Sequence, residues 1–68
     1  MQRRMTYIET RDDVTYVAEI HRNWEGLRIM YFVNDKHIGT EMMQKPCSEP
    51  ECEALCEAWV KGERKARI

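Results

Sequence analysis

A short polar segment, Ser48-Glu49-Pro50-Glu51, most constrains the fold because it marks the start of a helix. The serine can accept a hydrogen bond from the backbone N–H three residues further on, and the glutamate at that position can bond back to it. Proline in the first helical turn gives up no hydrogen bond. The segment therefore predicts a helix over about residues 49–61, with a different kind of structure before it.

The predicted helix carries an apolar stripe. Its residues recur at i, i+3, i+4 and i+7, and they are Cys52, Leu55, Cys56 and Trp59. This spacing places them on one face of a helix, while Glu49, Glu53 and Glu57 fall on another. The stripe should pack on a sheet. Gly62 is the predicted stop, after which residues 63–68 form either a frayed extension or a basic tail.

The chain before this helix is rich in β-branched and aromatic residues that roughly alternate with polar ones. Such segments predict strands at about residues 5–10, 14–21, 27–33 and 37–43. Residues 22–26 have the length, Asn and Gly of a hairpin loop, and Asn34-Asp35 suits a turn with positive φ. The prediction is a single α+β domain over residues 1–68, in which a three- or four-stranded antiparallel β-meander carries one C-terminal helix on one face.

A two-residue turn at Asn34-Asp35 also predicts the pairing register. It sets Val33 opposite Lys36, and counting outward pairs Tyr31 with Ile38, Ile29 with Thr40, and Arg28 with Glu41. The face expected to meet the helix then carries Leu27, Ile29, Tyr31, Val33, Ile38 and Met42, together with Val14, Tyr16, Ala18 and Ile20. The other face carries Val17, Glu19, His21, Arg28, Met30, Phe32, His37, Gly39, Glu41 and Met43.

That second face has no helix left to cover it. Monomeric proteins seldom expose a large apolar patch, and a chain of 68 residues has a thin core that a dimer or a bound partner would supplement. Methionine, one aromatic ring and scattered charges are typical of a contact surface. We therefore expect a protein partner or a homodimer there, the alternative being a wet face with isolated apolar atoms.

Trp24 lies in the loop between the second and third predicted strands. Tryptophan is frequent among residues that dominate binding energy, which makes Trp24 a candidate anchor for a protein partner. The alternative is a ring that folds back beside Ile20 and Leu27 and completes the core. The predicted partner-binding residues are Trp24, Met30, Phe32, Arg28, Glu53 and Glu57.

The residue types that could carry chemistry do not form a known signature. Cys47, Cys52 and Cys56 with His21 or His37 could supply zinc ligands, but their spacing differs from that of zinc knuckles, and two of the cysteines belong to the apolar stripe. Cys47, next to the helix N-terminus, is the expected reactive thiol. Neither histidine has a marked catalytic partner, and there is no glycine-rich phosphate loop. The sequence predicts no enzyme activity, cofactor or metal.

Charge and polarity limit which partners and which cellular compartment we expect for this chain. Eleven Lys and Arg against twelve Asp and Glu give a formal charge of -1, which offers no reason to expect nucleic acid or an anionic membrane. The N-terminal segment is too polar for a secretory signal, and no stretch approaches the roughly 20 apolar residues of a transmembrane helix. An odd number of cysteines argues against a disulfide framework. We therefore expect a cytoplasmic protein with free thiols.

A small nucleic-acid-binding domain is the second hypothesis. Tyr7, Phe32 and Arg28 on an open sheet could combine base stacking with phosphate contacts. A basic tail would add the cations Lys61, Arg64, Lys65 and Arg67. The acidic helix and the acidic turn at Asp12-Asp13 oppose this hypothesis because they repel phosphate.

No segment matches the signature of a known family. In its size, acidic helix and single sheet the chain resembles small phage or mobile-element proteins that bind and disable a host complex, including anti-CRISPR proteins. The resemblance implies a non-enzymatic inhibitor that acts by steric occlusion, or by charge mimicry from Glu49, Glu53 and Glu57. It does not specify the partner, the host process or the oligomeric state.

Overall fold

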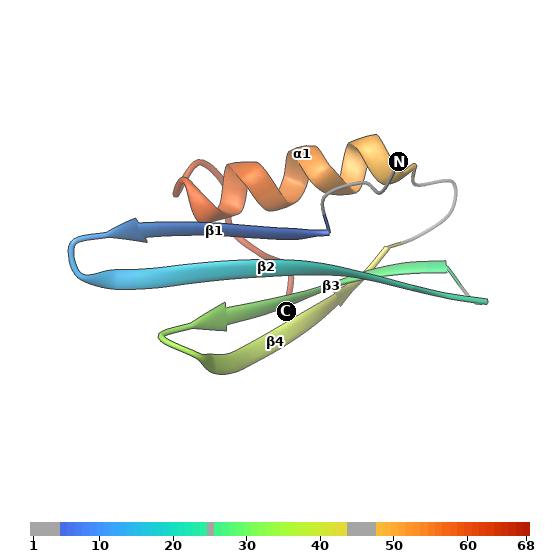
Figure 1. Ribbon diagram of the computed structural model, residues 1–68. Helices are drawn as coiled ribbons and strands as arrows, with labels where there is room; N and C mark the ends of the chain where they lie inside the picture. Colours follow the sequence, from blue (N-terminus) through green and yellow to red (C-terminus); the bar gives the residue numbers. More distant parts are fainter. Residues whose placement is uncertain (1–4, 25, 44–47) are drawn as a thin grey trace.

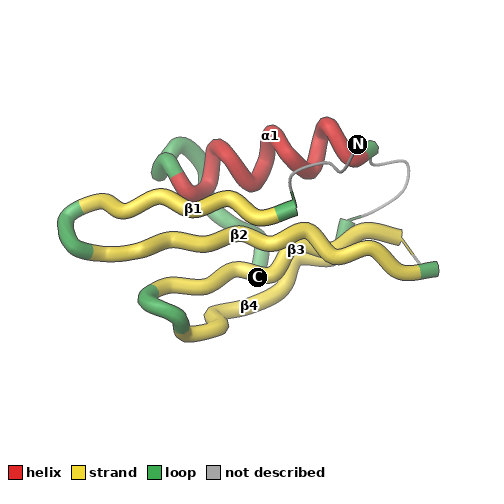
Figure 2. The backbone as a smooth tube through the Cα atoms, in the orientation of Figure 1, coloured by secondary structure: helices red, strands yellow, loops and turns green. Residues whose placement is uncertain are grey.

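The protein is a four-stranded antiparallel sheet with one helix on one side (Figures 1 and 2). The computed structural model describes residues 5–24, 26–43 and 48–68. The elements are β1 (Thr6–Arg11), β2 (Val14–Asn23), β3 (Gly26–Val33), β4 (Lys36–Met42) and α1 (Glu49–Val60), and the strands lie in sequence order in the sheet. This confirms the α+β meander with a C-terminal helix, and it decides the choice between three and four strands in favour of four.

A tight turn joins β1 to β2, and another joins β3 to β4. Asp12 and Asp13 have φ of 52° and 65°, and Asn34 and Asp35 have φ of 50° and 68°. Positive φ at both central residues is the requirement of a type I′ turn, which Asn and Asp tolerate better than other residues with a side chain. The Asn34 side-chain oxygen also accepts a hydrogen bond from the backbone N–H of Thr15 at 3.0 Å. The turn chemistry in the sequence is therefore confirmed.

The helix begins and ends where the sequence predicts. The Ser48 side chain accepts a hydrogen bond from the backbone N–H of Glu51, and Pro50 lies in the first turn. At the other end Gly62 has φ of 80°, and its N–H bonds to the carbonyl oxygen of Trp59 at 2.9 Å. A capping serine and a terminal glycine satisfy backbone groups that a helix end leaves without partners.

The apolar stripe of α1 packs on the sheet and forms the core. The buried residues are Ala18, Ile20, Ile29, Tyr31, Cys52, Cys56, Trp59 and Val60. The Trp59 ring stands edge-on to Tyr16, with 5.7 Å between ring centroids, and lies 4.7 Å from the Tyr31 ring. Cys52 and Cys56 fill space between helix and sheet, as predicted from their place in the stripe.

The predicted register of β4 is wrong beyond its first residues. Val33 pairs with Lys36 as expected, but Ile38 is an extra residue between the partners of Phe32 and Tyr31, so β4 contains a bulge. The bulge pairs Tyr31 with Gly39, Ile29 with Glu41, and Arg28 with Met42. A shift of one residue exchanges the two faces of a strand. Gly39, Glu41 and Met43 therefore lie on the helix side, whereas Met42 lies on the opposite side and Ile38 is exposed.

Candidate functional site

The side of the sheet away from α1 is uncovered in the part of the chain that the structure describes (Figure 1). We call it the open face. The strand pairing places on it Thr6, Ile8, Thr10, Thr15, Val17, Glu19, His21, Arg28, Met30, Phe32, His37, Thr40 and Met42. These residues alternate with the core residues of the same strands, as the two sides of a pleated sheet require.

An apolar row crosses the open face. Ile8 is the cross-strand partner of Val17, and Val17 is the partner of Phe32, so the three side chains lie beside one another on β1, β2 and β3. The Phe32 ring continues onto the His37 ring of β4, at 5.3 Å between centroids. Met30 lies two residues before Phe32, on the same side of β3. Val17, Phe32 and Met30 are half-buried, and Ile8 at the end of the row is 62% exposed.

Charged side chains border the apolar row at one end. The imidazole of His21 contacts the Glu19 carboxylate at 3.0 Å, and Arg28 is the cross-strand partner of His21. The Arg28 Nε atom is buried and has no hydrogen-bond partner among the described residues. Charges of both signs therefore lie at this end of the open face, beside the exposed side chain of Met42.

Trp24 projects into solvent from the turn between β2 and β3. Its side chain is 88% exposed, so the structure does not show the alternative in which the ring completes the core. The β2–β3 hairpin is the longest of the three, because β1 begins opposite Glu19 and β4 ends opposite Arg28, both short of the turn. The β2–β3 hairpin, whose connection contains Trp24, therefore extends beyond the other two strands, as Figure 1 shows for the ribbon.

The predicted binding residues divide between two sides of the molecule. Trp24, Arg28, Met30 and Phe32 all belong to the β2–β3 hairpin, and the last three share the open face. Glu53 and Glu57 lie on α1, on the other side of the sheet. Of the helix glutamates, Glu57 pairs with Lys61 at 2.8 Å and Glu49 pairs with Arg22. Two of the three carboxylates expected to act by charge mimicry, Glu49 and Glu57, are therefore paired with cations.

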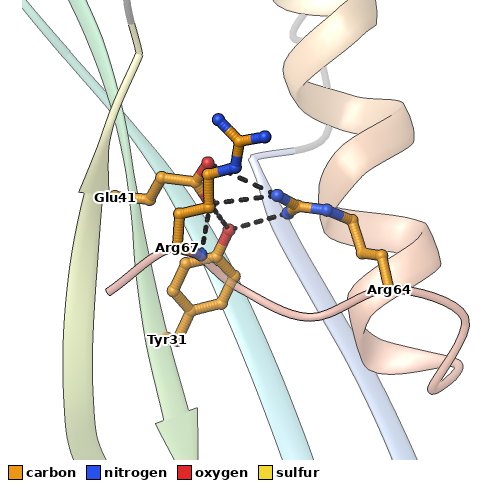
Figure 3. Close-up of polar contacts among 4 residues, drawn as sticks. All are labelled: Tyr31, Glu41, Arg64 and Arg67. Atoms are coloured by element: carbon orange, nitrogen blue, oxygen red, sulfur yellow. Dashed lines mark hydrogen bonds and ion pairs between the residues drawn. The ribbon is translucent and has the colours of Figure 1, made fainter.

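A buried polar cluster holds the C-terminal tail against the helix side of the sheet (Figure 3). The Tyr31 hydroxyl donates a hydrogen bond to Glu41 at 2.6 Å. The Arg64 guanidinium donates to the Tyr31 hydroxyl at 3.1 Å and to both Glu41 oxygens at 3.2 and 3.3 Å. The backbone N–H of Arg67 also donates to Glu41. We call these four residues the tail clasp.

The sequence did not predict the tail clasp, because the predicted register of β4 was wrong. The wrong register placed Glu41 on the open face and left Arg64 in a tail of undecided order. Gly39 was the available signal, since a glycine inside a strand marks a bulge or a close approach of other atoms. Here it marks both, because a Cβ on Gly39 would lie 2.7 Å from the side chain of Ile68. The clasp also commits Arg64 to the helix side, away from the open face.

The zinc-site and reactive-thiol alternatives depend on the three cysteines, two of which lie in the core. Cys52 and Cys56 are fully buried, and burial raises the pKa of the Cys56 thiol to about 12, which suppresses the thiolate. In residues 5–24, 26–43 and 48–68, no group of three or more His, Cys, Asp and Glu side chains is placed to hold a metal ion. Cys47, the expected reactive thiol, lies outside the described residues.

Comparisons with known proteins supply no relative from which a function could be inferred, so the inference depends on the fold and the open face. No protein-family model, curated protein or solved structure matches this chain. Within the ranges that the structure describes, no helix combines the length and apolarity needed to cross a lipid bilayer.

Proposed function

We propose that this chain is a non-enzymatic protein-binding module that uses the open face and Trp24. The observation that carries the proposal is the uncovered apolar row of Ile8, Val17 and Phe32, with an 88% exposed tryptophan at the end of the same sheet. Exposed apolar patches with polar borders are typical of interaction sites, and tryptophan is common among the residues that dominate binding energy.

The make-up of the open face suits a protein partner. Met30 and Met42 have adaptable side chains that fit irregular apolar surfaces. Glu19, His21 and Arg28 supply charges of both signs at one border, which would fix the orientation of a partner more than its affinity. Binding would block a surface of the partner by steric occlusion. As part of the proposal, the setting is the cytoplasm, where a phage-encoded inhibitor of a host complex would act.

Nucleic acid is the second candidate partner. The Phe32 and His37 rings lie side by side on the open face, and Arg28 is on the same side, an arrangement that permits base stacking and one phosphate contact. The basic tail does not extend this surface, because Arg64 is held in the tail clasp on the helix side. Among the described residues of the open face, Arg28 is the single Lys or Arg, and so small a positive charge favours a protein partner over a polyanion.

The test is affinity capture from cytosolic extract, with and without nuclease, using a tagged chain and two variants. Phe32→Glu places a charge in the apolar row and should abolish recovery of a specific protein complex. Glu57→Gln, on the helix side, is the matched control and should leave recovery unchanged. Recovery that disappears with nuclease would favour the nucleic-acid function, and equal loss in both variants would contradict binding through the open face.

A further inference from the structure

The two edges of the sheet differ in how well they are protected against pairing. Edge strands expose unpaired N–H and C=O groups, and proteins commonly block them with bulges, proline or covering segments. β4 has the bulge at Ile38, and the C-terminal tail packs against it through Ile68 and Gly39. β1 is a regular six-residue strand without a bulge, glycine or proline.

Among the described residues, no strand pairs with the edge of β1 that faces away from β2, and the direction of its backbone groups can be assigned. The N–H of Ile20 bonds to the carbonyl oxygen of Met5 at 2.7 Å, so Met5 directs its backbone groups toward β2. These directions alternate along an antiparallel strand, which leaves the N–H and C=O groups of Thr6, Ile8 and Thr10 pointing away from the sheet. Thr6, Ile8, Glu9 and Thr10 are exposed, so the helix does not cover this edge, and a cleft of about 180 Å³ separates part of β1 from α1. The cleft is lined by Tyr7, Ile8, Glu9, Glu57, Val60 and Lys61.

We propose that β1 pairs antiparallel with β1 of a second copy of this chain, forming a two-fold dimer with one continuous sheet. The proposal concerns the edge of the sheet and does not rest on the proposed function of the open face. Main-chain hydrogen bonds would supply the attraction, as in other cases of strand addition. The exposed Ile8 side chain would be covered by its counterpart.

Side-chain chemistry selects the register of this pairing. With Ile8 opposite Ile8 of the second copy, Thr6 faces Thr10 and Tyr7 faces Glu9, and three pairs exchange about six hydrogen bonds. A shift by one hydrogen-bonding step in one direction would set the two Glu9 carboxylates opposite each other, and like charges in that position are destabilising. The opposite shift would shorten the paired segment within β1. Ile8 therefore lies on the two-fold axis.

The dimer would double the apolar row of the open face. Residues paired across an antiparallel ladder project from the same side of a sheet. The rows of Phe32, Val17 and Ile8 from the two copies would meet at the axis and run without interruption across the joined sheet. A surface of this width suits a larger partner than one copy alone would.

Disulfide trapping tests the dimer at its axis, with Cys47→Ser in every variant. Cα atoms in a hydrogen-bonded pair are about 5.5 Å apart, within the range of a disulfide, so Ile8→Cys should form a covalent dimer on mild oxidation. Thr10→Cys is the matched control and should not, because the two Thr10 residues lie about 13 Å apart along the strands. Mixing Thr6→Cys with Thr10→Cys should restore cross-linking. Equal cross-linking of Ile8→Cys and Thr10→Cys would overturn the proposed register.

Sedimentation equilibrium distinguishes this dimer from one formed through the open face. The native chain should have twice the 8.2 kDa mass of a single copy. Ile8→Pro removes an outward N–H that makes no bond within the sheet, and it should halve that mass, while Phe32→Lys should leave it unchanged. A native mass of 8.2 kDa, or a mass halved by Phe32→Lys alone, would overturn the proposal. If Ile8→Pro does not fold by circular dichroism, the cross-linking pattern decides.

Discussion

At Arg64 a single guanidinium joins the C-terminal tail to β3 and β4. Its hydrogen bonds reach the Tyr31 hydroxyl and both oxygens of Glu41, a carboxylate that is only 8% exposed. Removing one partner of such a pair leaves the other charged group buried without compensation, which costs far more than an exposed ion pair contributes. The tail clasp should therefore be necessary for stability, even though only Tyr31 of its four residues belongs to the apolar core.

The first prediction concerns Arg64→Met, which keeps the apolar stem and removes the charge. We expect the free energy of unfolding to fall by about 2 kcal/mol, less than the roughly 3–5 kcal/mol typical of fully buried pairs, because Arg64 is partly exposed. Arg67→Met is the control, because only the backbone of Arg67 bonds to Glu41. Urea denaturation measures both, and a similar loss in the two variants would contradict the role of the Arg64 guanidinium.

The second prediction concerns alkaline pH. Burial raises the pKa of the Cys56 thiol from its ordinary 9.0 to about 12, and burial together with the hydrogen bond to Glu41 raises the pKa of Tyr31. Above about pH 9 the unfolded chain releases the Cys56 proton and the folded chain keeps it, so stability should fall as the pH rises toward 12. Urea midpoints at about pH 8 and pH 11 measure the slope. Cys56→Ala should show a shallower decline, and an identical slope would contradict this assignment.

Among the elements, the two type I′ turns are the most local features of the fold. Asp35 has φ of 68°, a region that glycine adopts without strain. The third prediction is that Asp35→Gly stabilises the protein by about 0.5 kcal/mol, since Asn-Gly is the preferred pair for this turn. The neighbouring substitution Lys36→Gly, in β4, should instead destabilise it by about 0.5–1 kcal/mol. Thermal unfolding compares them, and a loss of stability in Asp35→Gly would show that the turn is not strained.

The strands, turns and helix ends were predictable because their signals are local. Asn34-Asp35 requires only its own backbone preference, and the cap at Ser48 requires only the residues that follow it. The bulge at Ile38 is different, because it lies beside Gly39, which the distant tail residue Ile68 approaches closely. The tail clasp depends on side chains that are 10 to 33 residues apart in the chain. Contacts of this kind follow from the tertiary fold and leave little periodic pattern in the sequence.

The whole molecule is a two-layer structure with its core on one side of the sheet. The molecule measures 35 × 27 × 19 Å, and one face of its sheet is covered by no described element (Figure 1). The sequence predicted the existence of this face and placed Met30, Phe32 and Arg28 on it, because β2 and β3 pair in a regular register. It did not predict that Glu41 and Met43 lie on the helix side and Met42 on the open face, which leaves the open face with the same number of methionines and one carboxylate fewer.

The most direct test of the central claim is to measure the folding and the partner recovery of Trp24→Ala side by side. Trp24 makes little contact with the core, so the melting temperature should change by less than about 4 °C, as expected for a surface substitution. Recovery of the protein complex from cytosolic extract should fall at least about tenfold. A tryptophan that becomes buried against a partner contributes more than about 1.4 kcal/mol to binding. Undiminished recovery, or a large fall in melting temperature, would contradict the assignment of Trp24 and the open face as the binding surface.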